Sequence, residues 1–195
     1  MKYSKILLTL VCLSLTVFFG CSDSTAVSPV SSTGANVSAQ KLNLVSGLTT
    51  LLLPPGTGTK SASTTVVCSP TATTTLNLSC SYRGLLGLPV TRNAKFTVPA
   101  GALNQTTSIT MSFDSVDVSV HFEPEGLVFN QPASLDYSST GLGNLGLTPI
   151  SFYYIDNAGY GTPMPYVNLS ILSLLGQINM KGGQIPHFSK YAFAR

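Results

Sequence analysis

The stretch AKFTVPAGALNQTTSITMSF, residues 94–113, decides the class of fold. It contains two short runs in which every second residue is apolar. The apolar residues of these runs are Ala94, Phe96, Val98, Ile109, Met111 and Phe113. A period of two is typical of β-strands with one buried face, and the Pro-Ala-Gly sequence at residues 99–101 is typical of a turn. The stretch therefore predicts two β-strands joined by a turn.

The same alternation continues on both sides of this stretch. Val116, Val118, Val120 and Phe122 alternate with polar residues, and further alternating runs occupy residues 133–137 and 150–154. Short strands separated by closely spaced turns are typical of antiparallel β-sandwiches. We predict a single all-β domain of this kind. The polar partners in the first of these runs are expected on the outer, solvated face; they are Asp117, Ser119 and His121.

The composition supports this class and excludes nucleic acid as a partner. Hydrophobic residues make up 44% of the 195-residue chain, whereas charged residues make up only 9%. The polar surface must therefore consist largely of Ser, Thr, Asn and Gly, as is common in exported β proteins. The formal charge is +3, but removing Lys2 and Lys5 of the targeting segment leaves eight basic against seven acidic residues. This balance does not attract a polyanion.

The first twenty residues have the parts of an export signal. Lys2 and Lys5 form a basic start, an apolar run follows at residues 6–19, and a small residue precedes Cys21. The run is too short for a comfortable membrane span, so we predict a signal peptide over residues 1–20.

The sequence VFFGC, residues 17–21, resembles the lipobox of bacterial lipoproteins, with Phe18 where that family prefers leucine. The resemblance implies that the Cys21 thiol carries a diacylglyceryl group, so a lipid bilayer is the expected partner. Ser22 rather than aspartate follows the cysteine, which by the sorting rule of that family implies the outer membrane, at its periplasmic face or at the cell surface. Ordinary secretion with cleavage after Ala26 is the alternative.

Residues 21–59 are expected to form a mostly disordered tether rich in Ser and Thr. Residues 22–41 are small and polar without an apolar period, and such segments cannot bury enough surface to fold. The apolar island at residues 42–53 is compatible with a strand or a short helix, and residues 56–60 have the composition of a loop. The folded domain is expected over residues 60–195.

Two cysteines remain once Cys12 of the signal peptide and Cys21, the expected site of lipidation, are set aside, namely Cys68 and Cys80. An even pair in an oxidising compartment favours a disulfide between them. A zinc site is a weaker alternative, because neither cysteine has a second Cys or a His at ligand spacing.

Three further segments resemble one known domain. They are FTVPAGAL at residues 96–103, FEPEGLVFNQPASL at residues 122–135 and HFSKYA at residues 187–192. In order and spacing they are similar to the ZU-five domain, which is shared by zonula occludens proteins, Unc-five netrin receptors and ankyrins and has relatives in bacterial lipoproteins. The resemblance covers roughly residues 60–195. It implies a β-sandwich used for binding or for force-bearing contacts.

The chain offers few residues for chemistry. His121 and His187 are the two histidines, so a hydrolytic triad would need one of them. A metal site could use His121 with Glu123 and Glu125, but the proline and glycine within this segment turn the chain and separate the carboxylates. No glycine-rich phosphate loop lies between a strand and a helix. We therefore expect no conventional enzyme, no cofactor and no metal.

The leading expectation is a non-catalytic structural or protein-interaction module of the cell envelope, whose protein partner is unknown. Two alternatives stay open. In some relatives of the ZU-five domain an HFS sequence cuts its own backbone, which makes His187, Phe188 and Ser189 candidate self-cleavage residues, with His187 and Ser189 on one face of a regular strand. A glycan-binding module is the other, because three tyrosines flank a loop region and rings stack on sugars. They are Tyr153, Tyr160 and Tyr166.

The lipobox resemblance predicts that Cys21 is acylated. Metabolic labelling with a fatty-acid analogue should mark the wild-type chain and should not mark Cys21→Ser, because only the thiol accepts the diacylglyceryl group. Equal labelling of both chains, or of neither, would show that Cys21 is not the attachment site.

Overall fold

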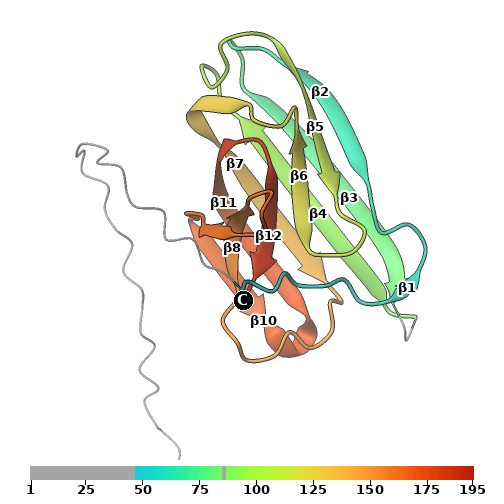
Figure 1. Ribbon diagram of the computed structural model, residues 1–195. Helices are drawn as coiled ribbons and strands as arrows, with labels where there is room; N and C mark the ends of the chain where they lie inside the picture. The colour runs from blue at the N-terminus through green and yellow to red at the C-terminus, as the bar shows by residue number, and fades with distance from the viewer. Residues whose placement is uncertain (1–46, 85–86) are drawn as a thin grey trace, which may run out of the picture. The chain divides into compact units, whose positions relative to one another are not determined.

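The computed structural model describes residues 47–84 and 87–195. Two six-stranded antiparallel sheets pack face to face, which confirms the predicted all-β sandwich (Figure 1). The first sheet has the order β1 (Gly56–Thr57), β3 (Thr74–Gly84), β4 (Pro89–Val98), β7 (Val128–Thr140), β11 (Gln177–His187) and β10 (Asn168–Leu172). The second has the order β2 (Ser63–Cys68), β5 (Thr107–Phe113), β6 (Ser119–Glu123), β12 (Lys190–Ala194), β8 (Ser151–Ile155) and β9 (Gly161–Pro163).

One short 3-10 turn, η1 (Ser173–Leu175), joins β10 to β11. In the part of the chain that the structure describes, no helix is long and apolar enough to cross a membrane.

The strands that the alternation predicted face the core as expected. Phe96 and Val98 of β4 are buried, and so are Ile109 and Met111 of β5. Their polar neighbours in the sequence point to the outer face of each sheet. A single hydrophobic cluster fills the space between the sheets, so the two layers share one core.

Four phenylalanine rings form the centre of one half of this core. Phe96 and Phe122 are 4.5 Å apart between ring centroids, and Phe122 stacks on Phe188 at 5.5 Å. Phe129 meets Phe188 edge to face at 4.9 Å. The rings come from both sheets and from the connection between β11 and β12, so they join parts of the chain that lie far apart in the sequence. Such pairs stabilise the fold beyond the area that they bury.

The sandwich begins earlier than residue 60. Leu51 and Leu53 are buried in the core, and the backbone of this segment is bonded to the last strand and to the β5–β6 connection. The Leu51 N–H donates to the Phe193 carbonyl at 2.9 Å, and the Leu53 N–H donates to the Val116 carbonyl at 2.8 Å. Residues 47–59, expected to be tether, are therefore part of the folded domain. The rest of the predicted tether, the signal peptide and Cys21 lie outside the described residues.

The expected disulfide is not found, because Cys68 and Cys80 are free. Cys80 lies on β3, where its sulfur is 3.2 Å from the Thr59 carbonyl and 3.9 Å from that of Ser61, beside the start of β2. Cys68 ends β2, and a strand rises about 3.3 Å per residue, so the two thiols lie roughly 20 Å apart along the sandwich. A disulfide needs Cα atoms within about 7 Å. Spacing in the sequence did not reveal that the cysteines occupy different sheets.

The two thiols should therefore react separately. We expect iodoacetamide to modify Cys80 before Cys68 in the folded, unreduced protein, because Cys68 is fully buried and burial raises the pKa of its thiol. Peptide mass spectrometry after timed alkylation gives the order, and alkylation in denaturant without reductant is the control, in which both should react. If both cysteines stay unmodified in denaturant, the two sulfurs are joined in a disulfide.

Candidate functional site

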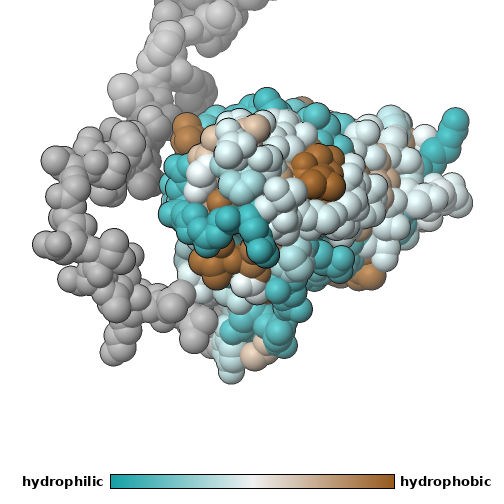
Figure 2. Space-filling model, turned by 90° about the horizontal axis from the view of Figure 1, so that it is seen from above, coloured by the Kyte–Doolittle hydropathy of each residue, from teal (hydrophilic) through white to brown (hydrophobic). Residues whose placement is uncertain are grey.

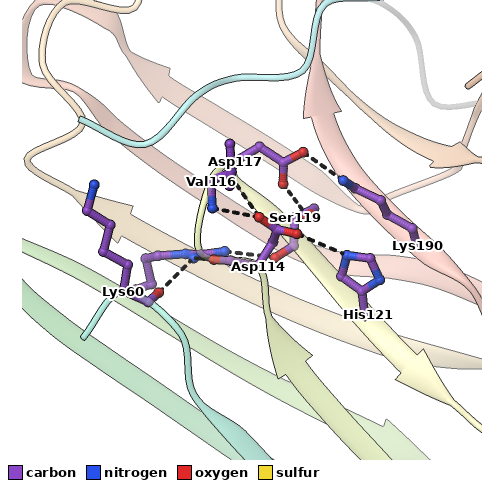
Figure 3. A network of polar contacts seen from close by, with 8 residues as sticks. Lys60, Asp114, Val116, Asp117, Ser119, His121 and Lys190 are labelled. Atoms are coloured by element: carbon purple, nitrogen blue, oxygen red, sulfur yellow. Dashed lines mark hydrogen bonds and ion pairs between the residues drawn. The ribbon is translucent and has the colours of Figure 1, made fainter. Parts of the chain in front are cut away.

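Figure 3 shows a polar cluster that includes Asp114, Asp117, Ser119, His121 and Lys190. A buried arginine is hydrogen-bonded to the backbone of this cluster. Arg92 is on β4 and is completely buried, two residues before Ala94 and on the same inward face. Its guanidinium donates to the backbone carbonyls of Asp114 and Ser119, both at 2.7 Å. It also lies over the Phe113 ring, 4.3 Å from the centroid, which adds a cation–π contact. Arg92 thus joins the first sheet to the β5–β6 connection of the second.

Two more hydrogen bonds bring the total made by the Arg92 guanidinium to four. Its Nε donates to the Tyr137 hydroxyl at 3.2 Å, and Nη1 also reaches the Lys60 carbonyl at 3.4 Å. Burial raises the pKa of Tyr137, and the nearby Arg92 cation opposes this rise. A buried charge needs hydrogen-bond partners of this kind, because a buried charge without them would lower the free energy of unfolding by several kcal/mol (roughly 3–5).

The carboxylates of the β5–β6 connection shape the loop that Arg92 binds. Asp114 Oδ1 accepts the N–H groups of Val116 at 2.6 Å and Asp117 at 3.2 Å. Burial opposes ionisation of Asp114, but these two hydrogen bonds, together with Lys190 and His121, outweigh it and lower the pKa of Asp114 below its ordinary value. The Asp114 carboxylate therefore accepts hydrogen bonds from the backbone of its own loop, as in an Asx turn.

Asp117 links the loop to the last strand. One of its oxygens accepts the Ser119 hydroxyl, and the other accepts Lys190 Nζ of β12 at 2.7 Å. Asp117 and Ser119 are buried, so the prediction that they face solvent is wrong. Val116 was predicted on the inward face of the same run but is 64% exposed. The strand begins only at Ser119, and residues 114–118 form a loop that turns the Asp117 carboxylate toward the protein.

His121 is half-buried at the edge of this cluster. Its Nε2 lies 3.5 Å from Asp114 Oδ2, at the long limit of an ion pair, and has no hydrogen-bond partner among the described residues. Burial lowers the pKa of His121, and the Lys190 cation lowers it further, while Asp114 and Asp117 act in the opposite direction. The histidine is therefore neutral at neutral pH.

A hollow of about 280 Å³ opens beside His121. Its lining includes the ionisable side chains of His121, Glu123, Glu125, Asp156 and Lys190, together with Ser189. Within the described residues, no three His, Cys, Asp or Glu side chains are arranged to hold a metal ion. His121, Glu123 and Glu125 thus share a hollow without forming a coordination site.

The HFS residues form the corner at which the chain passes from one sheet to the other. His187 ends β11, and Phe188 and Ser189 connect it to β12 in the opposite sheet. The chain therefore bends here, whereas the expectation placed His187 and Ser189 on one face of a regular strand. The His187 ring packs edge to face on Tyr154, with centroids 4.5 Å apart, and Ser189 lines the hollow beside His121. Burial lowers the pKa of His187.

The corner is held by its backbone. The Phe188 N–H donates to the Leu127 carbonyl at 2.7 Å, and the Phe188 carbonyl accepts the Gly126 N–H at 3.2 Å. The Ser189 carbonyl accepts the Phe122 N–H at 3.1 Å. An acyl shift would attack the Phe188 carbonyl, which already has a donor, but in the described part of the chain no base is hydrogen-bonded to the Ser189 hydroxyl.

The three tyrosines proposed for glycan binding are spread over different elements. Tyr153 is half-buried on β8, Tyr160 is exposed in the turn before β9, and Tyr166 is exposed just before β10 of the other sheet. A hollow of about 460 Å³ lies elsewhere, on the outer face of the first sheet, where asparagine, serine and charged side chains line it.

No family model matches the chain, and no curated protein or solved structure is similar to it.

We predict that Arg92→Met lowers the free energy of unfolding by about 2–4 kcal/mol, because it removes the donor of the Asp114 carbonyl and leaves the buried Ser119 carbonyl with only the long 3.4 Å bond from the Asp114 N–H. Arg83→Met is the matched control, since Arg83 is exposed on β3 and its loss should change stability by no more than about 0.5 kcal/mol. Urea denaturation followed by circular dichroism measures both. Equal midpoints for the two variants would show that Arg92 does not hold the sheets together.

Proposed function

We propose that the chain is a membrane-anchored exported lipoprotein whose β-sandwich is a non-catalytic structural or protein-interaction module of the cell envelope. The signal peptide and the lipobox-like sequence around Cys21 support the anchor. Ser22 after the cysteine favours the outer membrane, at its periplasmic face or at the cell surface. Two acyl chains on one cysteine bind a bilayer stably, whereas one chain does not.

The contacts of the polar cluster carry the non-catalytic part of the proposal. Arg92, Asp114 and Asp117 contact Ser119 or lie beside His121, and each is hydrogen-bonded to the protein's own backbone or to a neighbouring side chain. Ser119 is buried with its hydroxyl bound to Asp117 and its carbonyl bound to Arg92, so a substrate does not reach it. Groups of the types used in hydrolysis thus stabilise a loop.

Open sheet edges support an interaction role. Strands β10 and β9 end the two sheets on one side, and β1 and β2 end them on the other. An edge strand offers unpaired backbone groups to which a partner chain can add a strand. The resemblance to ZU-five domains, used elsewhere for binding and force-bearing contacts, favours the same role. The phenylalanines of its three segments meet in one cluster.

Self-cleavage at the HFS corner is the competing function, favoured by the Gly126 N–H that contacts the Phe188 carbonyl. The packing of the His187 ring on Tyr154 favours the structural alternative, in which Phe188 anchors the corner in the core.

Intact-mass spectrometry of the detergent-extracted chain under denaturing conditions distinguishes the two. We expect one species that begins at acylated Cys21 and ends at Arg195, because the corner is packed for stability. Ser189→Ala is the control and should give the same species with only the mass change of the substitution. Loss of residues 189–195 in the wild type, abolished by Ser189→Ala, would establish self-cleavage instead.

A further inference from the structure

Four exposed leucines gather at the end of the sandwich where the chain terminates. Leu172, Leu174 and Leu175 belong to β10 and η1, and the last two are 83% and 68% exposed. Leu147 is 98% exposed and belongs to the β7–β8 connection. This connection is bonded to η1, because the Leu145 N–H donates to the Ser173 carbonyl at 3.0 Å. We call Leu147, Leu172, Leu174 and Leu175 the leucine tip.

The backbone displays the leucine tip on a closely packed turn. The Leu142 N–H donates to the Gly176 carbonyl at 3.0 Å, and the Gly176 N–H donates to Ser173. Gly176 has a φ of +58°, and a side chain there would collide with the backbone of Gly143. These backbone groups of the turn are bonded within the protein, which lowers the cost of bringing the turn into contact with hydrocarbon.

The surroundings of the tip contain very few charges. Residues 137–155 and 157–180, which include both segments of the tip, contain no Asp, Glu, Lys, Arg or His. The leucines can therefore leave water without the cost of desolvating a charged side chain on the same segments. Leu172, Leu174 and Leu175 line one apolar surface, and an exposed apolar surface of this kind marks a contact with a partner or a membrane.

The start of the domain lies beside the tip. The Thr49 N–H donates to the Arg195 carbonyl at 2.9 Å, and the Arg195 guanidinium donates to the Leu145 carbonyl at 2.5 Å. Figure 1 shows the C-terminus, the first described residues and β10 at the same end of the sandwich. Cys21 is 28 positions before Thr49, and a flexible chain of that length spans about 30 Å on average. An acyl anchor at Cys21 would keep the tip close to the bilayer at high effective concentration.

We propose that the leucine tip inserts into the lipid bilayer and forms a second membrane contact beside the acyl anchor. The proposal rests on the proposed function, because the anchor supplies the proximity. It orients the sandwich with β10 and η1 toward the membrane. The opposite end of the sandwich then faces away, and its surface carries apolar residues only in small patches separated by polar surface (Figure 2).

Photocrosslinking of the full chain tests the insertion. Photoreactive benzoyl-phenylalanine replaces either Leu175 or, as the matched control, Val67, which is 65% exposed near the far end of β2. The detergent-extracted chains are reconstituted into vesicles of phosphatidylethanolamine and phosphatidylglycerol and are illuminated. We expect a phospholipid adduct, measured by mass, from position 175 and not from position 67.

A second change shows that the adduct reports insertion. Leu174→Ser in the chain with the photoreactive residue at position 175 should lower the adduct yield by about tenfold, because withdrawing one inserted leucine weakens the contact by about that factor. Equal adducts at positions 67 and 175, an adduct at neither, or a covalent dimer from position 175 would each overturn the proposal. The dimer would identify a second copy as the occupant.

The same mass spectra separate this proposal from the anchor. A chain without the acyl mass on Cys21 that still forms the lipid adduct at position 175 would refute the lipoprotein and support the tip. An acylated chain without the adduct would refute only the tip.

Discussion

The guanidinium of Arg92 is the constraint on which the polar half of this structure depends. It is charged and completely buried, and its partners are backbone carbonyls and a tyrosine hydroxyl. A charge in this position is stable only while all of those acceptors stay in place, so it fixes the β5–β6 connection against the first sheet. The contacts of Asp117 with Ser119 and of Asp117 with Lys190 follow, because that connection holds Asp117.

The aromatic half of the core has a comparable dependence on Phe188. Its ring lies against Phe122 and Phe129 while its own N–H and carbonyl are bonded to the β6–β7 connection. The residue therefore holds the chain at the point where it passes between the sheets. The packing of Phe188 therefore accounts for the HFS sequence independently of any reaction of the Ser189 hydroxyl.

Alternation in the sequence predicted several strands correctly, because the spacing of apolar residues along a strand is enough to show which of its faces is buried. The residues 94–98 and 109–113 are strands with the expected inward faces. Leu51 and Leu53 obey the same rule, but the apolar island around them was too short to assign by pattern.

The polar cluster could not be predicted in this way, because burial of a polar group depends on partners from elsewhere in the chain. Arg92 occupies the same alternate positions as Ala94 and Phe96, and this was the only indication in the sequence that its side chain is buried. Asp117 and Ser119 alternate with valines and were therefore placed outside, and Lys190, the partner of Asp117, is 73 positions away in the sequence. The carboxylates that form no ion pair among the described residues include Glu123, Glu125 and Asp156, which lie at or just beyond the strand ends opposite Arg195. The end beside the predicted anchor is thus poor in acids, and the unpaired carboxylates are at the other end. This distribution suits an anionic membrane surface, because it keeps the carboxylates away from the negative lipid headgroups.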